Sequence, residues 1–332
     1  MTFEHWRQQA GGALRFFSLG RHALVEALRI AGVGPGDAVL LPEFICRDAL
    51  ASLHALGARP VWYAIDDRLI PAERPDVWPT ARAVVAVNYF GFPQRLDPFR
   101  AYAARTGAVL IEDNAHGFLS RDENGHWLGT RTGIGVFSLR KSLLLADGAM
   151  IRCGAGEFAD RLSAPLAENG SGYAPAVAVK ARLRGLPVGG PLIAKAATTA
   201  IRVLRQWRSA DATWDHDPEA ERVIPAAAAP HLGLQTDLAA FDPEAEIARR
   251  RAAYTDAEAF AGRHGIKPLF VALEDLTVPY GFAFRADDAG RQAMQGWAAR
   301  RGHDVITWPA LPHDIAGRVP DALRNIHLVN FL

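Results

Sequence analysis

Short apolar runs alternate with amphipathic stretches along the first half of the chain. The apolar runs predict strands at 38–42, 60–65, 83–88, 108–113, 135–138 and 149–153. Between them, apolar residues at helical spacing predict helices over 20–30, 48–56 and 96–105. Apolar strands that alternate with helices are typical of a mainly parallel sheet covered on both faces. We therefore expect an α/β fold.

The pattern changes after residue 153. Residues 154 to about 240 predict a helical segment that is interrupted by a Gly- and Pro-rich break. The remainder predicts a mixture of helix and strand, with elements at 243–262, 278–284 and 289–301. We therefore expect two domains: a large α/β domain over 1–240 and a small α+β domain over 241–332.

Composition excludes several classes of protein. The 332 residues have a net charge of +1 and are 49% hydrophobic, which argues against a disordered chain or a strongly basic nucleic-acid binder. No apolar run reaches the roughly 18 residues that span a bilayer, and the N-terminus has no signal-peptide pattern. Cys46 and Cys153 form neither a disulfide framework nor a metal motif, so we expect a cytoplasmic protein without a metal.

Polar residues follow three of the predicted strands. Asn88, Asp113 and Ser138 stand at carboxyl ends of strands, where α/β sheets carry their chemistry. A carboxylate such as Asp113 could pair with a protonated heterocyclic nitrogen, or it could cap the next helix. His116, three residues later, is equally compatible with a site and with an ordinary loop.

Lysine is scarce in this chain. Of 37 basic residues only four are lysines, at positions 141, 180, 195 and 267. Lys141 follows Ser138 and stands 28 positions after Asp113, and only lysine supplies an amine that can form a Schiff base. The alternative is a surface lysine beside Arg140.

The helix predicted from Gly20 could bind an anion. A glycine followed by an amphipathic helix presents backbone N–H groups and the positive end of the helix dipole. Ser18 and Arg21 could add side-chain donors. The pattern is common, so it gains weight only in combination with the other two segments.

The order and spacing of these segments carry a resemblance. The matching motifs are Gly-Pro-Gly-Asp-Ala-Val at 34–39, Leu-Pro-Glu-Phe-Ile-Cys at 41–46, Val-Asn-Tyr-Phe-Gly-Phe-Pro at 87–93, Ile-Glu-Asp-Asn-Ala-His at 111–116 and Phe-Ser-Leu-Arg-Lys at 137–141. Over about residues 14–153 the chain resembles the DegT-type family of pyridoxal phosphate (PLP)-dependent nucleotide-sugar aminotransferases, as a divergent member. The resemblance implies the fold type I PLP-transferase architecture.

The resemblance also implies roles for individual residues. Lys141 would attach PLP covalently and shuttle a proton, Asp113 would pair with the pyridine nitrogen, and His116 would lie near the phenolic oxygen. The phosphate would be held by Ser138 and by the segment Gly20, Arg21 and His22. The residue that stacks on the ring would be Cys46 or Phe44.

The implied function is amino transfer from glutamate to a ketone on a nucleotide-linked sugar, in a homodimer whose subunits share the site. Two alternatives remain. One is a PLP-dependent sugar dehydratase, although such relatives usually carry His where this chain keeps Lys141. The other is a degenerate relative that binds PLP or regulates, since the family's Asn-Tyr-Arg segment is not found. A Rossmann-type NAD enzyme is disfavoured, because no Gly-x-Gly-x-x-Gly follows the first strand.

Overall fold

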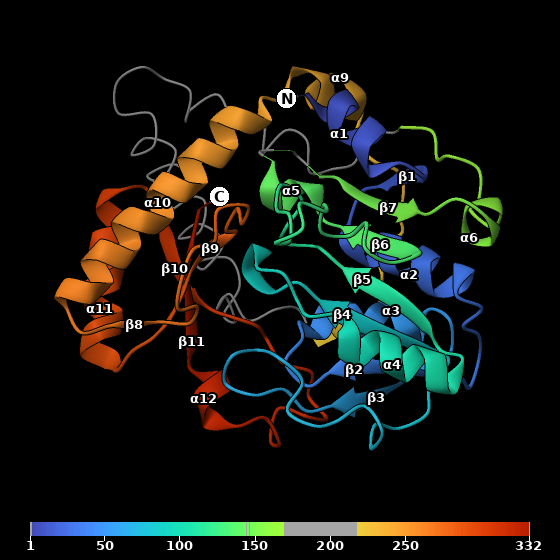
Figure 1. The fold of residues 1–332 in the computed structure, drawn as a ribbon, viewed down its shortest axis with the longest axis horizontal. Coiled ribbons are helices and arrows are strands. Elements are labelled where there is room, and N and C mark those ends of the chain that lie inside the picture. The colour runs from blue at the N-terminus through green and yellow to red at the C-terminus, as the bar shows by residue number, and fades with distance from the viewer. Residues whose placement is uncertain (1, 144, 146, 169–217, 332) are drawn as a thin grey trace.

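The larger sheet of the computed structural model has seven strands (Figure 1). Their bounds are β1 (Ala13–Phe17), β2 (Ala38–Pro42), β3 (Arg59–Tyr63), β4 (Ala83–Val87), β5 (Val109–Asp113), β6 (Ile134–Phe137) and β7 (Ala149–Cys153). They lie in the order β1-β7-β6-β5-β4-β2-β3. The pairs from β3 to β6 are parallel, whereas β7 runs antiparallel to both of its neighbours. The predicted mainly parallel sheet is therefore confirmed.

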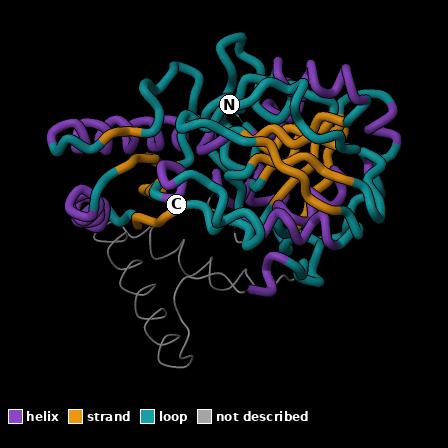
Figure 2. The backbone as a smooth tube through the Cα atoms, turned by 90° about the horizontal axis from the view of Figure 1, so that it is seen from below, coloured by secondary structure: helices purple, strands orange, loops and turns teal. Residues whose placement is uncertain are grey.

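Helices cover both faces of this sheet (Figure 2). They are α1 (Phe3–Ala10), α2 (Gly20–Ile30), α3 (Leu50–His54), α4 (Asp97–Thr106), α5 (Leu139–Ser142), α6 (Glu157–Asp160) and α9 (Leu234–Ala240). Strands β2 and β4 are buried along their whole length, as expected for strands with helices on both sides. Helix α2 buries Ala23, Leu24, Ala27 and Leu28 on the side that faces the sheet.

A second, antiparallel sheet forms the C-terminal part. Its strands are β8 (Lys267–Pro268), β9 (Gly281–Arg285), β10 (Asp304–Thr307) and β11 (Ile326–Asn330), in the order β10-β11-β9-β8. The accompanying helices are α10 (Pro243–Arg263), α11 (Asp288–Arg300) and α12 (Asp321–Arg324). Helix α10 begins where the Asp242 side chain accepts hydrogen bonds from two first-turn amides. The predicted small α+β portion is confirmed.

The structure describes residues 2–143, 145, 147–168 and 218–331. The two helices predicted around residues 180–204 lie outside this part. Within the described residues, none of the helices combines the length and the apolar character needed to cross a membrane.

Several elements differ from the sequence prediction, which did not contain α1, β1, β10 or β11. Strand β1 was not predicted, because it forms by pairing with β7 more than 130 positions later and lacks a long apolar run. The helix predicted over 48–56 is shorter: residues 47–49 form a 3-10 turn that leads into α3. The last turn before Gly57 also tightens, since the Gly57 amide donates to the His54 carbonyl.

Candidate active site

The carboxyl ends of β4, β5 and β6 meet at one edge of the larger sheet. The Asn88 amide donates to the Asp113 carbonyl at 2.9 Å, and the Asn114 amide donates to the Val136 carbonyl at 2.8 Å, so the three strand ends are tied in register. A cavity of about 240 Å³ opens here. Its polar lining is Arg21, Cys46, Asp48, Asn88, Asp113, His116, Ser138, Arg140 and Lys141. Gly20 and Trp308 also line it.

Asp113 ends β5 with its carboxylate at the cavity. One carboxylate oxygen accepts the Ala115 amide at 2.9 Å. Burial raises the pKa of Asp113, although that hydrogen bond and Lys141 act in the opposite direction. The carboxylate thus turns the chain after the strand, as a cap would, and also faces the cavity, where a cationic partner would offset its desolvation.

Lys141 enters the same cavity from α5, which begins directly after Ser138. Its Nζ lies 3.1 Å from Nε2 of His116. Burial lowers the pKa of Lys141 and Arg140 lowers it further, while Cys46 and Asp113 raise it. An amine with a lowered pKa is a better nucleophile and base at neutral pH.

His116 is fixed from three sides. Its ring stacks on Tyr280 with centroids 4.6 Å apart and the planes 5° from parallel, and on Phe90 at 5.8 Å and 7°. The Phe90 amide donates to Nδ1 at 3.3 Å. Burial and the neighbouring Lys141 hold the pKa of His116 well below its usual range.

The start of α2 forms the other end of the cavity. Leu19, at its N-cap, contributes no side-chain cap, and its first turn holds no acidic residue. A Cβ added to Gly20 would make ordinary van der Waals contact with the Ser138 Cβ at 3.5 Å, so the helix start lies directly beside Ser138. The site therefore offers uncapped amides to an anion.

Side chains near this helix start have other partners. The Arg21 guanidinium reaches Asp48 at 3.3 Å. The Ser18 hydroxyl donates to the Ala227 carbonyl at 2.5 Å. Arg21 therefore lies at the cavity in an ion pair with Asp48. The Ser18 hydroxyl is instead bound to the loop at Ala227, 209 positions later in the sequence.

Of three further candidates from the sequence, Cys46, Phe44 and His22, only Cys46 lines the cavity. Phe44 is fully buried and packs on Tyr89 and Trp308 rather than lining the cavity. His22, the third residue of α2, is buried and is not part of the cavity lining, and burial lowers its pKa. Of the two candidates for ring stacking, only Cys46 is at the cavity.

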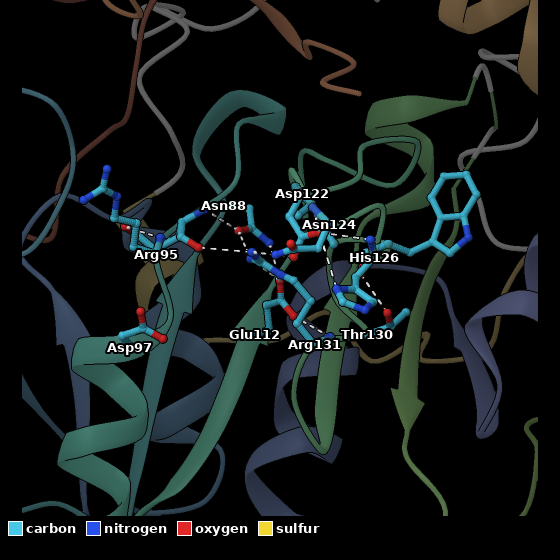
Figure 3. Close-up of polar contacts among 12 residues, drawn as sticks. Asn88, Arg95, Asp97, Glu112, Asp122, Asn124, His126, Thr130 and Arg131 are labelled. Carbon is cyan, nitrogen blue, oxygen red and sulfur yellow. Dashed lines mark hydrogen bonds and ion pairs between the residues drawn. The ribbon is translucent and has the colours of Figure 1, made fainter. Parts of the chain in front are cut away.

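A buried polar network joins Asn88, Glu112 and Arg131 at the ends of β4 and β5 (Figure 3). Arg131 forms an ion pair with Glu112 at 2.6 Å and donates to the Asn88 side chain at 2.9 Å. Asn88 in turn donates to Glu112 at 2.8 Å. Since Glu112 and Asn88 are fully buried, this closed network fixes the strand ends that carry Asn88 and Asp113.

Arg250 connects the segment after Lys141 to the C-terminal part. Its Nη2 donates to the carbonyls of Lys141 and Ser142, both at 3.1 Å, and its Nη1 donates to Tyr280 at 3.2 Å. Glu246 balances its charge at 2.6 Å. The predictions from sequence did not include Arg250, nor Asp48 and Trp308 in the cavity lining.

The residues present fit PLP. The cavity places an acid for a protonated ring nitrogen, an amine for the aldehyde and an uncapped helix start for a phosphate around one space. The carboxylate of Asp113 faces this space at a burial cost that a cation would offset. Among the described residues, no group of three or more His, Cys, Asp or Glu side chains could hold a metal ion.

Comparison with known proteins gives consistent matches. Residues 16–174 match the DegT/DnrJ/EryC1/StrS aminotransferase family. The aminotransferase TlmJ from Streptoalloteichus hindustanus superposes with a TM-score of 0.59 at 21% identity, over 96% of this chain and 80% of that one. The Helicobacter pylori aminotransferase PseC, involved in the biosynthesis of pseudoaminic acid, gives 0.62 at 12% identity, over 96% and 81%.

A dehydratase shares the same fold. The E. coli GDP-4-keto-6-deoxy-D-mannose-3-dehydratase with bound hydrated PLP has a TM-score of 0.61 at 16% identity, over 98% of this chain and 85% of that one. At these identities the superpositions show a common fold and no more. The fold type I architecture expected from the sequence is confirmed.

Proposed function

Because residues 16–174 belong to the DegT/DnrJ/EryC1/StrS aminotransferase family, whose enzymes use PLP, we propose that this protein transfers an amino group from glutamate to a keto-sugar. The keto-sugar is nucleotide-linked, and the product serves sugar or polysaccharide biosynthesis. The observation that carries the proposal is the convergence of Lys141, Asp113 and the open start of α2 on one cavity.

Each residue has a defined task in this proposal. Lys141 would hold PLP covalently and would move a proton at the substrate carbon. Asp113 would keep the ring nitrogen protonated, since a negative carboxylate beside the nitrogen favours the cationic form of the ring. Ser138 and the amides at Gly20 and Arg21 bind the phosphate. When bound, PLP supplies an electron sink for the carbanion formed at the substrate carbon.

The second candidate function is a PLP-dependent sugar dehydratase. The fold shared with the E. coli dehydratase supports it. The retained Lys141 favours amino transfer, because family dehydratases usually carry His at that position. A degenerate relative that binds PLP without turnover is the third possibility.

An assay with a panel of nucleotide-linked keto-sugars separates these functions. Amino transfer converts glutamate to 2-oxoglutarate in step with the amino-sugar product. Deoxygenation of the sugar is a two-electron reduction that also consumes glutamate and forms 2-oxoglutarate, so the sugar product decides: a deoxy-keto-sugar with free ammonia, in place of an amino-sugar, identifies the dehydratase. PLP binding without either product supports the degenerate relative and overturns the proposed function.

We also propose a cytoplasmic homodimer in which the partner subunit completes the PLP site. Family architecture and the frequency of two-fold dimers support this assembly. Light scattering at micromolar concentration tests it. A monomer that binds PLP and turns over would contradict the shared site and leave the roles of Lys141 and Asp113 unaffected.

A further inference from the structure

The hydrogen bonds around His116 select one form of its ring. The Phe90 amide can only donate, and it points at Nδ1 at 3.3 Å. Nδ1 must therefore carry the lone pair, so the proton of the neutral ring sits on Nε2. In a doubly protonated ring, the N–H group at Nδ1 would point at the N–H group of Phe90, and neither could accept a hydrogen bond.

The surroundings of the ring disfavour its charged form. The rings of Tyr280 and Phe90 both stack with it, and His116 is 4% exposed. Burial and Lys141 both lower the pKa of His116. The neutral, Nε2-protonated ring is the form that satisfies every contact.

The Phe90 peptide is itself locked in place. Phe90 has a left-handed φ of 55°, which a bulky residue adopts only when its surroundings impose it. The Tyr280 amide donates to the Phe90 carbonyl at 2.8 Å. At the next residue, a Cβ on Gly91 would lie 2.4 Å from the Val278 carbonyl oxygen. The approach of residues 278–280 therefore aims the Phe90 amide at His116.

A proton on Nε2 has a consequence for Lys141. Nε2 lies 3.1 Å from Nζ, and an ammonium group has donors but no acceptor. A hydrogen bond from Nε2–H to Nζ forms only when the amine is uncharged. Of the other groups that act on Nζ, Cys46, Asp113 and Asp48 favour the charged amine, while burial and Arg140 disfavour it. The Nε2–H group of His116 adds a hydrogen-bond donor that favours the uncharged amine of Lys141.

We propose that His116 is a positioning residue that holds the free amine of Lys141 uncharged, through a Nε2–H···Nζ hydrogen bond whose direction the Phe90 amide sets. This inference rests on the proposed role of Lys141 as the cofactor-binding amine. It goes beyond that role by assigning the device that keeps the amine ready to react.

The first test measures the reactivity of Lys141 in PLP-free protein. Competitive labelling with acetic anhydride over a pH series is read by peptide mass spectrometry, with the exposed Lys267 as internal reference. His116→Phe keeps an aromatic ring beside Tyr280 and Phe90 and removes both nitrogens. It should shift the Lys141 labelling curve to higher pH and slow labelling at pH 7 about tenfold, the equivalent of one lost hydrogen bond.

Two further variants control this result. His116→Gln keeps an acceptor for the Phe90 amide and a donor for Nζ, so it should restore labelling to near the wild-type rate. His327→Phe replaces a buried histidine of β11 that packs at a tilt against Phe284, and it should leave the Lys141 curve unchanged. An unchanged curve in His116→Phe, or an equal shift in His327→Phe, would overturn the proposal.

The second test observes the His116 ring directly in the wild-type protein and uses a variant only to assign its signals. A long-range ¹⁵N–¹H spectrum of PLP-free wild type, with the His116 signals assigned by their loss in His116→Gln, should show a neutral ring protonated on Nε2. A ring protonated on Nδ1, or on both nitrogens at pH 7, contradicts the proposal even if His116→Phe does not fold. Both measurements use protein without PLP or substrate, so failure here is distinct from failure to transfer an amino group.

Discussion

Removal of the Arg250 guanidinium should lower the free energy of unfolding of the protein. It should also remove the hydrogen bonds that fix the backbone at Lys141. Arg250 is 1% exposed and donates to the carbonyls of Lys141, Ser142, Pro279 and Tyr280. Arg250→Met fills similar space and leaves these acceptors without their cationic donor. Loss of one partner from a buried charged network costs about 3–5 kcal/mol.

This free energy converts to a change in melting temperature. For 332 residues the entropy of unfolding is about 0.7 kcal/mol/K, so the expected decrease in Tm is about 4–7 °C. Differential scanning calorimetry measures it. PLP retention should weaken as well, because the carbonyl of Lys141 loses a contact that fixes its segment.

Arg249 provides the matched control. It stands next in the same helix and pairs with the same Glu246, but its side chain is 43% exposed. Arg249→Met should cost less than about 1 kcal/mol, as exposed ion pairs do. If the two variants melt within 1 °C of each other, or if only Arg249→Met loses PLP, the assigned role of Arg250 is wrong.

Three further predictions concern single side chains. Lys141→Arg should abolish turnover with an unchanged circular dichroism spectrum, since a guanidinium cannot bind PLP covalently; retained turnover would remove Lys141 from the mechanism. Asp113→Asn should still bind PLP but should lose turnover by orders of magnitude, because a neutral amide no longer holds the ring proton, and an unchanged rate would leave Asp113 as a cap alone. Burial alone would raise the pKa of Glu26, but hydrogen bonds from Arg29 and Ser163 lower it from 4.5 to about 2, so its stabilisation is present above pH 4.5 and is lost as the pH falls toward 2. Unfolding by urea across this range should depend less on pH in Glu26→Gln, and equal pH dependence in both proteins would contradict the lowered pKa of Glu26.

Local patterns predict the elements that depend on local contacts. Helix α2 has the bounds expected from the sequence, because its glycine start and its apolar spacing act within one turn. Asn88, Asp113 and Ser138 share one edge because parallel strands end on the same side of a sheet. These two rules bring most of the predicted residues to the cavity.

Long-range contacts account for what the sequence does not predict. Arg250 reaches the Lys141 carbonyl across 109 positions, and Trp308 enters the cavity lining from a segment without a recognisable motif. Phe44 follows β2 as the resemblance requires, yet its ring turns into the core against Trp308. Aromatic character alone does not distinguish a ring that faces the cavity from one that faces the core.

The most direct test of the account is the attachment of PLP to Lys141. Purified protein is mixed with PLP, reduced with borohydride, digested and analysed by peptide mass spectrometry. We predict a visible absorption band before reduction and the mass of reduced PLP on the Lys141 peptide, with Lys180, Lys195 and Lys267 unmodified. Absence of the band together with unmodified Lys141, or specific attachment at another lysine, would contradict the central claim.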